Sequence, residues 1–193
     1  MVTTRLTRAE RSALTRRDLL AAAEQRFVRD GYHATTLEAI ADDAGYSKGA
    51  VYSAFDGKAD LFLALADAII DRRLEDIATL FGQHPAGPGR LKTLAQRRVG
   101  EGSDRWVLTS IEFWLHAAGD PQLLEQFATR HRRLRSGLAA LASAQTPLGA
   151  EGWAITTIAL SNGLALERLI DSGGVPEDLM TRAQQLLYAA PAA

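Results

Sequence analysis

A few residues between positions 47 and 55 are spaced to touch a partner rather than the protein core. Val51 and Phe55 are four residues apart, so both fall on the buried face of one short helix. Four residues are then left on its outer face: Lys48, Gly49, Tyr52 and Ser53. Small side chains let a partner surface come close to the backbone, and the unpaired N–H groups of a helix N-terminus favour phosphate. The chemistry predicted is non-covalent contact with a phosphate-bearing surface.

Two short helices joined by a glycine must position this face. Thr36 is the expected N-cap of the first helix and Ser47 that of the second, with Gly45 supplying the turn between them. The first helix carries apolar residues at i, i+3, i+4 and i+7: Leu37, Ile40, Ala41 and Ala44. This order is typical of a helix-turn-helix, in which the second helix enters the major groove of DNA. Ordinary helical corners use the same turn chemistry, so a corner without DNA contact remains an alternative.

The composition of the whole chain is that of a globular, all-α protein. Of 193 residues, 47% are hydrophobic and 23% charged, and helical periodicity recurs without the alternation of strands, which predicts about nine helices. The absence of cysteine excludes disulfides, thiolate chemistry and Cys-ligated zinc. The segment 152–166 has no charge, but its fifteen residues fall short of the roughly 20 that cross a bilayer. We see no secretory signal and expect a cytoplasmic protein without membrane contact.

The basic residues near the N-terminus are more informative than the net charge of −1. Residues 1–17 hold only Glu10 against five arginines: Arg5, Arg8, Arg11, Arg16 and Arg17. We expect a basic arm over residues 1–15, either a solvated tail or an additional DNA contact. The first helix is expected to follow Thr15, with Asp18 as its capping partner, and to stop at Gly31.

Residues 16–65 resemble the N-terminal DNA-binding region of the TetR family of bacterial transcriptional regulators. The matching residues follow in order: Phe27, Gly31-Tyr32, Ala34-Thr35-Thr36, Ile40-Ala41, Ala44-Gly45, Ser47-Lys48-Gly49, Val51-Tyr52, Phe55, Lys58 and Leu61-Phe62. The resemblance implies a three-helix DNA-binding domain over 16–57 and a helical ligand-binding and dimerisation domain over 58–193.

The resemblance also assigns roles to individual residues. It implies that seven of them touch DNA: Thr36, Lys48, Gly49, Ala50, Tyr52, Ser53 and Lys58. Tyr52 and Lys58 would hold phosphates, while residues 48–50 and Ser53 would approach base edges. Many relatives carry an aromatic residue and then a histidine after the tyrosine, where this chain has Ser53 and Ala54. The operator sequence of a relative is therefore not carried over.

The C-terminal two thirds of the chain predict a ligand pocket and a dimer interface. Bulky rings and nearby polar groups mark the candidate pocket: Trp106, Thr109, Ser110, Phe113, Trp114, His116, Phe127, Trp153 and Asn162. Ordinary core packing is the alternative for each of them, and no ligand class follows. The segment 149–171 is apolar nearly all round and its neighbour from Pro176 is amphipathic, so the pair resembles the family's dimerisation helices. Plain intramolecular core is the alternative here.

We therefore expect a homodimeric TetR-like repressor that binds a near-palindromic double-stranded operator and is released by a small apolar or amphipathic ligand. The alternative is a helical small-molecule carrier or scaffold that keeps the fold without useful DNA affinity. We expect no cofactor, no metal site and no enzyme, since the four histidines lack close metal-ligand spacing and no nucleophile elbow or phosphate-binding loop is present. Acid–base chemistry by His116 and Glu112 is a more distant alternative.

Overall fold

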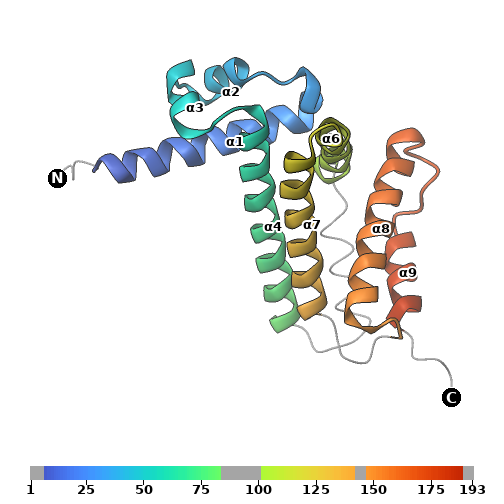
Figure 1. The fold of residues 1–193 in the computed structure, drawn as a ribbon. Helices are drawn as coiled ribbons and strands as arrows, with labels where there is room; N and C mark the ends of the chain where they lie inside the picture. The colour runs from blue at the N-terminus through green and yellow to red at the C-terminus, as the bar shows by residue number, and fades with distance from the viewer. Residues whose placement is uncertain (1–6, 84–100, 142–146, 189–193) are drawn as a thin grey trace, which may run out of the picture. The chain divides into compact units, whose positions relative to one another are not determined.

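The computed structural model describes residues 7–83, 101–141 and 147–188, and confirms an all-α protein (Figure 1). Eight helices and no strand lie in these ranges: α1 Arg8–Ala34, α2 Leu37–Ala44, α3 Lys48–Ala54, α4 Lys58–Gln83, α6 Glu101–Ala117, α7 Pro121–Leu141, α8 Gly149–Ile170 and α9 Leu179–Tyr188. The helical spacing of residues 91–99 predicts a further short helix, which lies outside the described residues. The glycines and prolines of residues 82–89 predict a loop; Gly82 and Gln83 instead belong to α4, and the rest of this range also lies outside the described residues.

The chain divides into two compact units, Met1–Ala68 and Ile69–Ala193, and helix α4 runs through the division. Each unit has its own buried core. Among the described helices, none combines the length and apolar character that a membrane crossing requires.

The first helix begins eight residues earlier than the sequence analysis predicted. Thr7 is its N-cap, and Thr7 and Glu10 form a reciprocal capping box in which each side chain accepts the other residue's backbone N–H, at 3.2 and 2.7 Å. The predicted start after Thr15, with Asp18 as capping partner, is therefore wrong. Asp18 instead accepts a hydrogen bond from the Tyr46 hydroxyl at 3.0 Å. Gly31 does interrupt the helix, because its φ of 82° is non-helical.

The core of the first unit forms where α1, α2, α3 and the start of α4 meet. Val51 and Phe55 are buried as predicted, and they share this core with Leu19, Phe27 and Ile40. Three aromatic rings pack together in it: the centre of the Phe27 ring lies 5.3 Å from that of Phe62 and 5.8 Å from that of Tyr32. The apolar spacing in the sequence thus determines which face of each short helix is turned inward.

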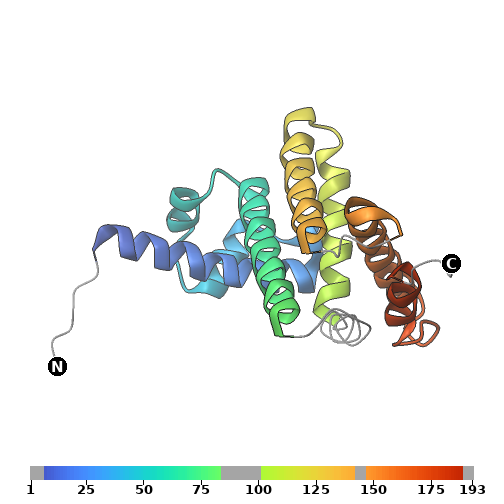
Figure 2. The same ribbon diagram turned by 90° about the horizontal axis from the view of Figure 1, so that it is seen from below.

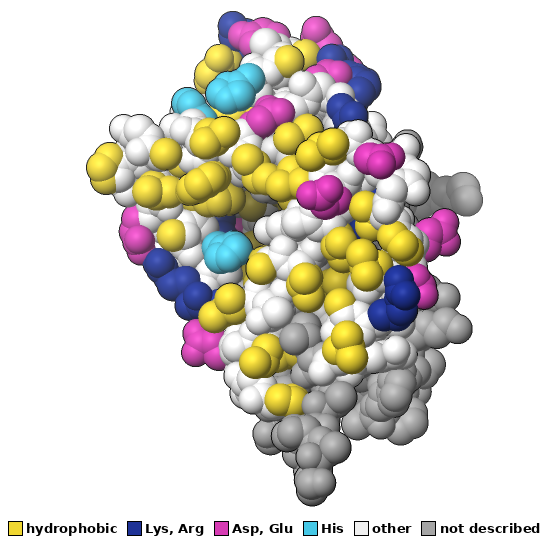
Figure 3. Space-filling model, turned by 90° about the vertical axis from the view of Figure 1, so that its right-hand side faces the viewer, with side chains coloured by type: hydrophobic (Ala, Val, Ile, Leu, Met, Phe, Trp, Pro, Cys, Tyr) yellow, Lys and Arg dark blue, Asp and Glu magenta, His cyan; other side chains and the backbone are white. Residues whose placement is uncertain are grey.

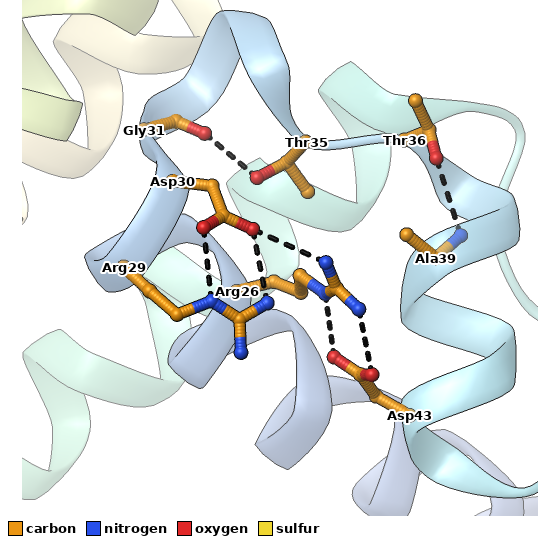
Figure 4. A network of polar contacts seen from close by, with 8 residues as sticks. All are labelled: Arg26, Arg29, Asp30, Gly31, Thr35, Thr36, Ala39 and Asp43. Carbon is orange, nitrogen blue, oxygen red and sulfur yellow. Dashed lines mark hydrogen bonds and ion pairs between the residues drawn. The ribbon is translucent and has the colours of Figure 1, made fainter.

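An ion-pair network fixes α2 against α1 (Figure 4). The Arg26 guanidinium donates two hydrogen bonds to the Asp43 carboxylate, at 2.5 and 2.7 Å, and a third to Asp30 at 3.2 Å. The hydrogen bond from Arg26 lowers the pKa of Asp43. Bidentate pairing is the most directional form of this interaction, so it sets the orientation of α2 as well as its proximity.

In the second unit, α6, α7 and α8 pack together and α9 lies along α8 (Figure 2). Residues of α4, α7 and α8 build the central cluster: Ile77, Leu80, Leu138, Trp153, Ala154 and Ile158. Helices α4 and α7 approach closely at Gly137, where an added Cβ would lie 2.6 Å from Leu74 Cδ1. The α6–α8 contact is held by Arg168, which donates to both carboxylate oxygens of Asp104 at 2.6 and 2.8 Å.

A buried chain of hydrogen bonds joins α8 to α9. The indole N–H of Trp153 donates to Gln184 Oε1 at 3.1 Å, and Gln184 Nε2 donates to Thr157 Oγ1 at 2.9 Å. All three residues are at most 2% exposed. Because unpaired buried polar groups cost free energy, these two hydrogen bonds fix the register of α9 on α8.

Candidate nucleic-acid interface

Local capping chemistry holds the predicted contact helix in place. Gly45 has a φ of 73°, a conformation that only glycine adopts at little cost, and its N–H donates to the carbonyls that end α2. The N-cap of the next helix, α3, is Ser47, whose hydroxyl accepts from the Ala50 N–H at 3.3 Å. The turn and the start of α3 are therefore fixed by residues adjacent to them in sequence.

Three outer-face residues of α3 lie together with an acidic residue of α2. Tyr52 is 51% exposed, whereas its neighbour Val51 is fully buried. The Lys48 ammonium lies 5.7 Å from the centre of the Tyr52 ring and forms an ion pair with Glu38. Ser53 is exposed on the same helix. The sequence analysis did not identify Glu38, although its place beside the buried Leu37 indicated an outward side chain.

Gly49 and Ser53 are small, so a partner surface can come close to the backbone of α3 on this face. An added Cβ at Gly49 would meet no atom nearer than Ser47 Oγ, at 3.8 Å, so no contact in the described part of the chain requires glycine there. The Ser53 hydroxyl donates to Gly49 O at 2.8 Å, which leaves its lone pairs available as acceptors. Ala50, beside them, is half-buried.

Thr36 and Lys58 flank the helix-turn-helix, and both form hydrogen bonds within the first unit. The Thr36 hydroxyl caps α2 by accepting from Ala39 N–H at 3.2 Å, and its own O–H remains available to a phosphate.

Lys58 lies at the start of α4 and is engaged by the protein's own backbone. Its ammonium donates to three carbonyls near the end of α1: those of Tyr32 at 2.9 Å, Thr35 at 3.0 Å and His33 at 3.2 Å. It also lies 4.5 Å from the centre of the Tyr32 ring. An ammonium group has three N–H donors, so these carbonyls use all of them. The phosphate contact implied by the family resemblance would require Lys58 to leave these partners.

Arg16 is a positioning residue that the sequence analysis counted only among the N-terminal arginines. Its guanidinium donates to Ala54 O at 2.7 Å and lies 4.2 Å from the centre of the Phe55 ring. It thus caps the last turn of α3 from α1, a contact between residues 38 positions apart that no local pattern indicates.

The residues predicted to line a ligand pocket lie in different environments. Phe113 is buried with its ring centre 5.2 Å from that of Phe127, and Trp106 and Thr109 are buried on the same helix as Phe113. The hydroxyls of Thr109 and Ser110 donate to carbonyls one turn earlier in α6.

The other members of the set differ in exposure, and the centre of the His116 ring lies 6.4 Å from that of Phe113. Trp153 lies in the central cluster with its indole N–H bonded to α9, and Asn162 is half-buried on α8. Trp114 and His116 are exposed on α6. The pocket therefore stays a prediction, with Phe113 and Phe127 as its best-supported members.

The fold and this face define a helix-turn-helix protein. Comparison with protein families gives two matches: "Bacterial regulatory proteins, tetR family" over residues 19–65, and "BetI-type transcriptional repressor, C-terminal" over residues 92–187. The chain belongs to the TetR family.

Individual relatives match only part of this chain. The transcriptional activator FasR of Mycolicibacterium smegmatis is 41% identical over 73 residues, which cover 38% of this chain and 32% of FasR. The repressor BepR of Brucella suis is 44% identical over 61 residues, 32% of this chain and 29% of BepR. The chain thus spans about a third of the length of these relatives. A transcriptional regulator from Rhodococcus sp. Rha1 shares the fold, with a TM-score of 0.70 at 24% identity, over 90% of this chain and 93% of that one.

Proposed function

We propose that this protein is a transcriptional repressor of the bacterial cytoplasm, which binds a near-palindromic DNA operator as a homodimer and releases it when a small molecule binds the second unit. The observation that carries the proposal is the outer face of α3, where an exposed Tyr52 and Lys48 flank a glycine that the fold itself does not need. In a family of regulatory proteins, such a face suits close approach to DNA. The proposed contacts are Thr36, Lys48, Gly49, Ala50, Tyr52 and Ser53.

The choice between repression and activation rests on the family match of the C-terminal residues. Both an activator and a repressor match part of this chain, so those similarities do not distinguish the two functions. Residues 92–187 match a BetI-type repressor model, which favours repression.

The homodimer is supported by an apolar stripe along α8. The inner face of this helix is buried in the central cluster, while residues on the opposite face are exposed or half-buried and apolar: Ile155, Ala159, Gly163, Leu166 and Ile170. Their spacing places them on one side of the helix, and Leu186 of α9 is 77% exposed. Figure 3 shows hydrophobic side chains gathered on the face that α8 and α9 present. A second copy of the same two helices is the cover we propose.

Replacing Gly163 by arginine should prevent dimerisation while leaving the fold of each protomer unchanged. An added Cβ at Gly163 meets nothing within 4 Å, so the single chain tolerates it, whereas a partner helix packed on the stripe would not. We expect a monomer in sedimentation velocity and a loss of DNA affinity, because a dimer spaces two recognition helices about 34–36 Å apart for successive major grooves. Gly119→Arg, at an exposed and open position between α6 and α7, is the matched control. A dimer that survives Gly163→Arg would place the interface elsewhere.

The DNA-binding proposal is tested by selecting duplexes from a random-sequence library and measuring affinity by fluorescence anisotropy. Gly49→Ala should weaken binding about tenfold, because its methyl group displaces the DNA, while the thermal midpoint stays level or rises since alanine favours helix. Tyr52→Ala should weaken binding to a similar degree. Gly119→Ala, at an open position between α6 and α7, serves as the matched control. If no sequence is enriched by the unaltered protein, the carrier or scaffold alternative is favoured.

A further inference from the structure

We propose that Lys48, which the family resemblance places near base edges, meets DNA phosphate, and that Glu38 competes with this phosphate for the Lys48 ammonium and thereby lowers the DNA affinity of the first unit. The inference rests on the proposed function, and it concerns a residue that neither the motif nor the family assigns to DNA contact. It assigns to α2 a direct part in controlling what α3 binds.

The geometry brings Glu38 and Lys48 together across the turn of the helix-turn-helix. Glu38 lies in the first turn of α2 and Lys48 is the first residue of α3, and their side chains form an ion pair. The side chains are 48% and 59% exposed, so an incoming phosphate can reach both. Lys48 also lies over Tyr52, so the ion pair is centred on the face proposed to meet DNA.

Both groups carry their charge at neutral pH. The hydrogen bond from Lys48 lowers the pKa of the Glu38 carboxyl, and the same contact raises the pKa of the Lys48 ammonium. A carboxylate and a phosphate oxygen are alternative acceptors for the same ammonium donors. When phosphate takes Lys48, the Glu38 carboxylate is left without its partner and close to a second negative charge.

The size of this competition must be modest, because the pair is exposed. Exposed ion pairs contribute little to stability, and salt screens them. Glu38 therefore lowers DNA affinity without abolishing it, and the contact yields to a DNA site that offers enough other interactions.

The chain provides a matched control for the charge itself. Asp42 lies four residues after Glu38 on the same helix and is exposed, so Asp42→Asn removes one negative charge from the same face. No ion pair between Asp42 and Lys48 is recorded within the part of the chain that the structure describes. An effect specific to the Lys48 pair must therefore be larger in Glu38→Gln than in Asp42→Asn.

The test is a double-mutant cycle on DNA binding. We would measure anisotropy with a selected duplex and a scrambled duplex, using the unaltered protein, Glu38→Gln, Asp42→Asn, Lys48→Met and the two charge variants in the Lys48→Met background. Glu38→Gln should raise affinity about threefold and Asp42→Asn less than that. In the Lys48→Met background, the gain from Glu38→Gln should shrink to that from Asp42→Asn.

Three results would overturn the inference, and they are separable. A gain from Glu38→Gln that is unchanged in the Lys48→Met background would show a general charge effect. A loss of affinity in Glu38→Gln would show that Glu38 itself contacts DNA. If the unaltered protein and Glu38→Gln bind neither duplex, the proposed function fails and the inference fails with it; in the first two cases, the proposed function stands.

Discussion

Replacing Trp153 by alanine is expected to lower the free energy of unfolding by about 3–5 kcal/mol, because a large, fully buried side chain is lost and the cavity closes only in part. Trp153 is completely buried and packs in the central cluster with Leu138 and with Ile77 and Leu80 of α4. Its indole N–H also bonds to Gln184. Urea unfolding followed by circular dichroism would measure the change.

Trp114 provides the control for this experiment. It is the same residue type, but 48% exposed on α6, so Trp114→Ala should cost much less, within about 1 kcal/mol. Equal losses in the two variants would mean that Trp153 is not the centre of this core. A smaller loss in Trp153→Phe than in Trp153→Ala would separate the packing of the ring from the hydrogen bond to Gln184.

Replacing Lys58 by methionine is expected to destabilise the first unit and to weaken DNA binding without changing its salt dependence. The substitution keeps the apolar stem but leaves three carbonyls near the end of α1 without their ammonium donor. Hydrogen bonds from charged groups contribute about 1.5–3 kcal/mol each, so a loss of at least this order is expected. DNA affinity should fall because the start of α4 no longer holds the end of α1. Thermal unfolding and anisotropy over a salt series would measure both effects.

Lys48→Met is the matched control, since Lys48 pairs with an exposed side chain instead of the backbone. The free energy of unfolding of Lys48→Met should change little. The slope of its log DNA affinity against log salt concentration should flatten by about 0.9, the contribution of one phosphate contact. If Lys58→Met gives this flattened slope with unchanged stability, then Lys58 contacts phosphate, as the family resemblance implies, and its role in holding the end of α1 is secondary.

The start of α1 shows that a local signal can be present and still be missed. Thr7 and Glu10 are three residues apart, the spacing of a capping box, and they form this capping box at the start of α1. The predicted start after Thr15 rested on the same three-residue spacing, with Asp18 as capping partner, and left the preceding arginines to a basic arm. Arginine is, however, a good helix former, so a run of basic residues does not exclude helix.

Local physics was sufficient to predict the helix-turn-helix. Each feature of this motif depends on residues within one turn of helix, so it can be predicted from a short stretch of sequence. These features are the caps at Thr36 and Ser47, the left-handed Gly45 and the four-residue spacing of Val51 and Phe55. The same holds for α8, whose apolar residues all round the helix predicted that one face would need a cover beyond its own core.

Contacts between distant residues were decided only by the tertiary structure. Arg16 caps α3 over 38 residues and Gln184 joins Trp153 to Thr157 over about 30. Lys58 binds carbonyls of α1, and Glu38 holds Lys48 across a turn. A long polar side chain reaches many candidate partners, and which one it meets depends on how the helices pack. The sequence by itself determined which residues form the contact helix and which face of it is buried, while the fold decided what its exposed charges bind before any DNA arrives.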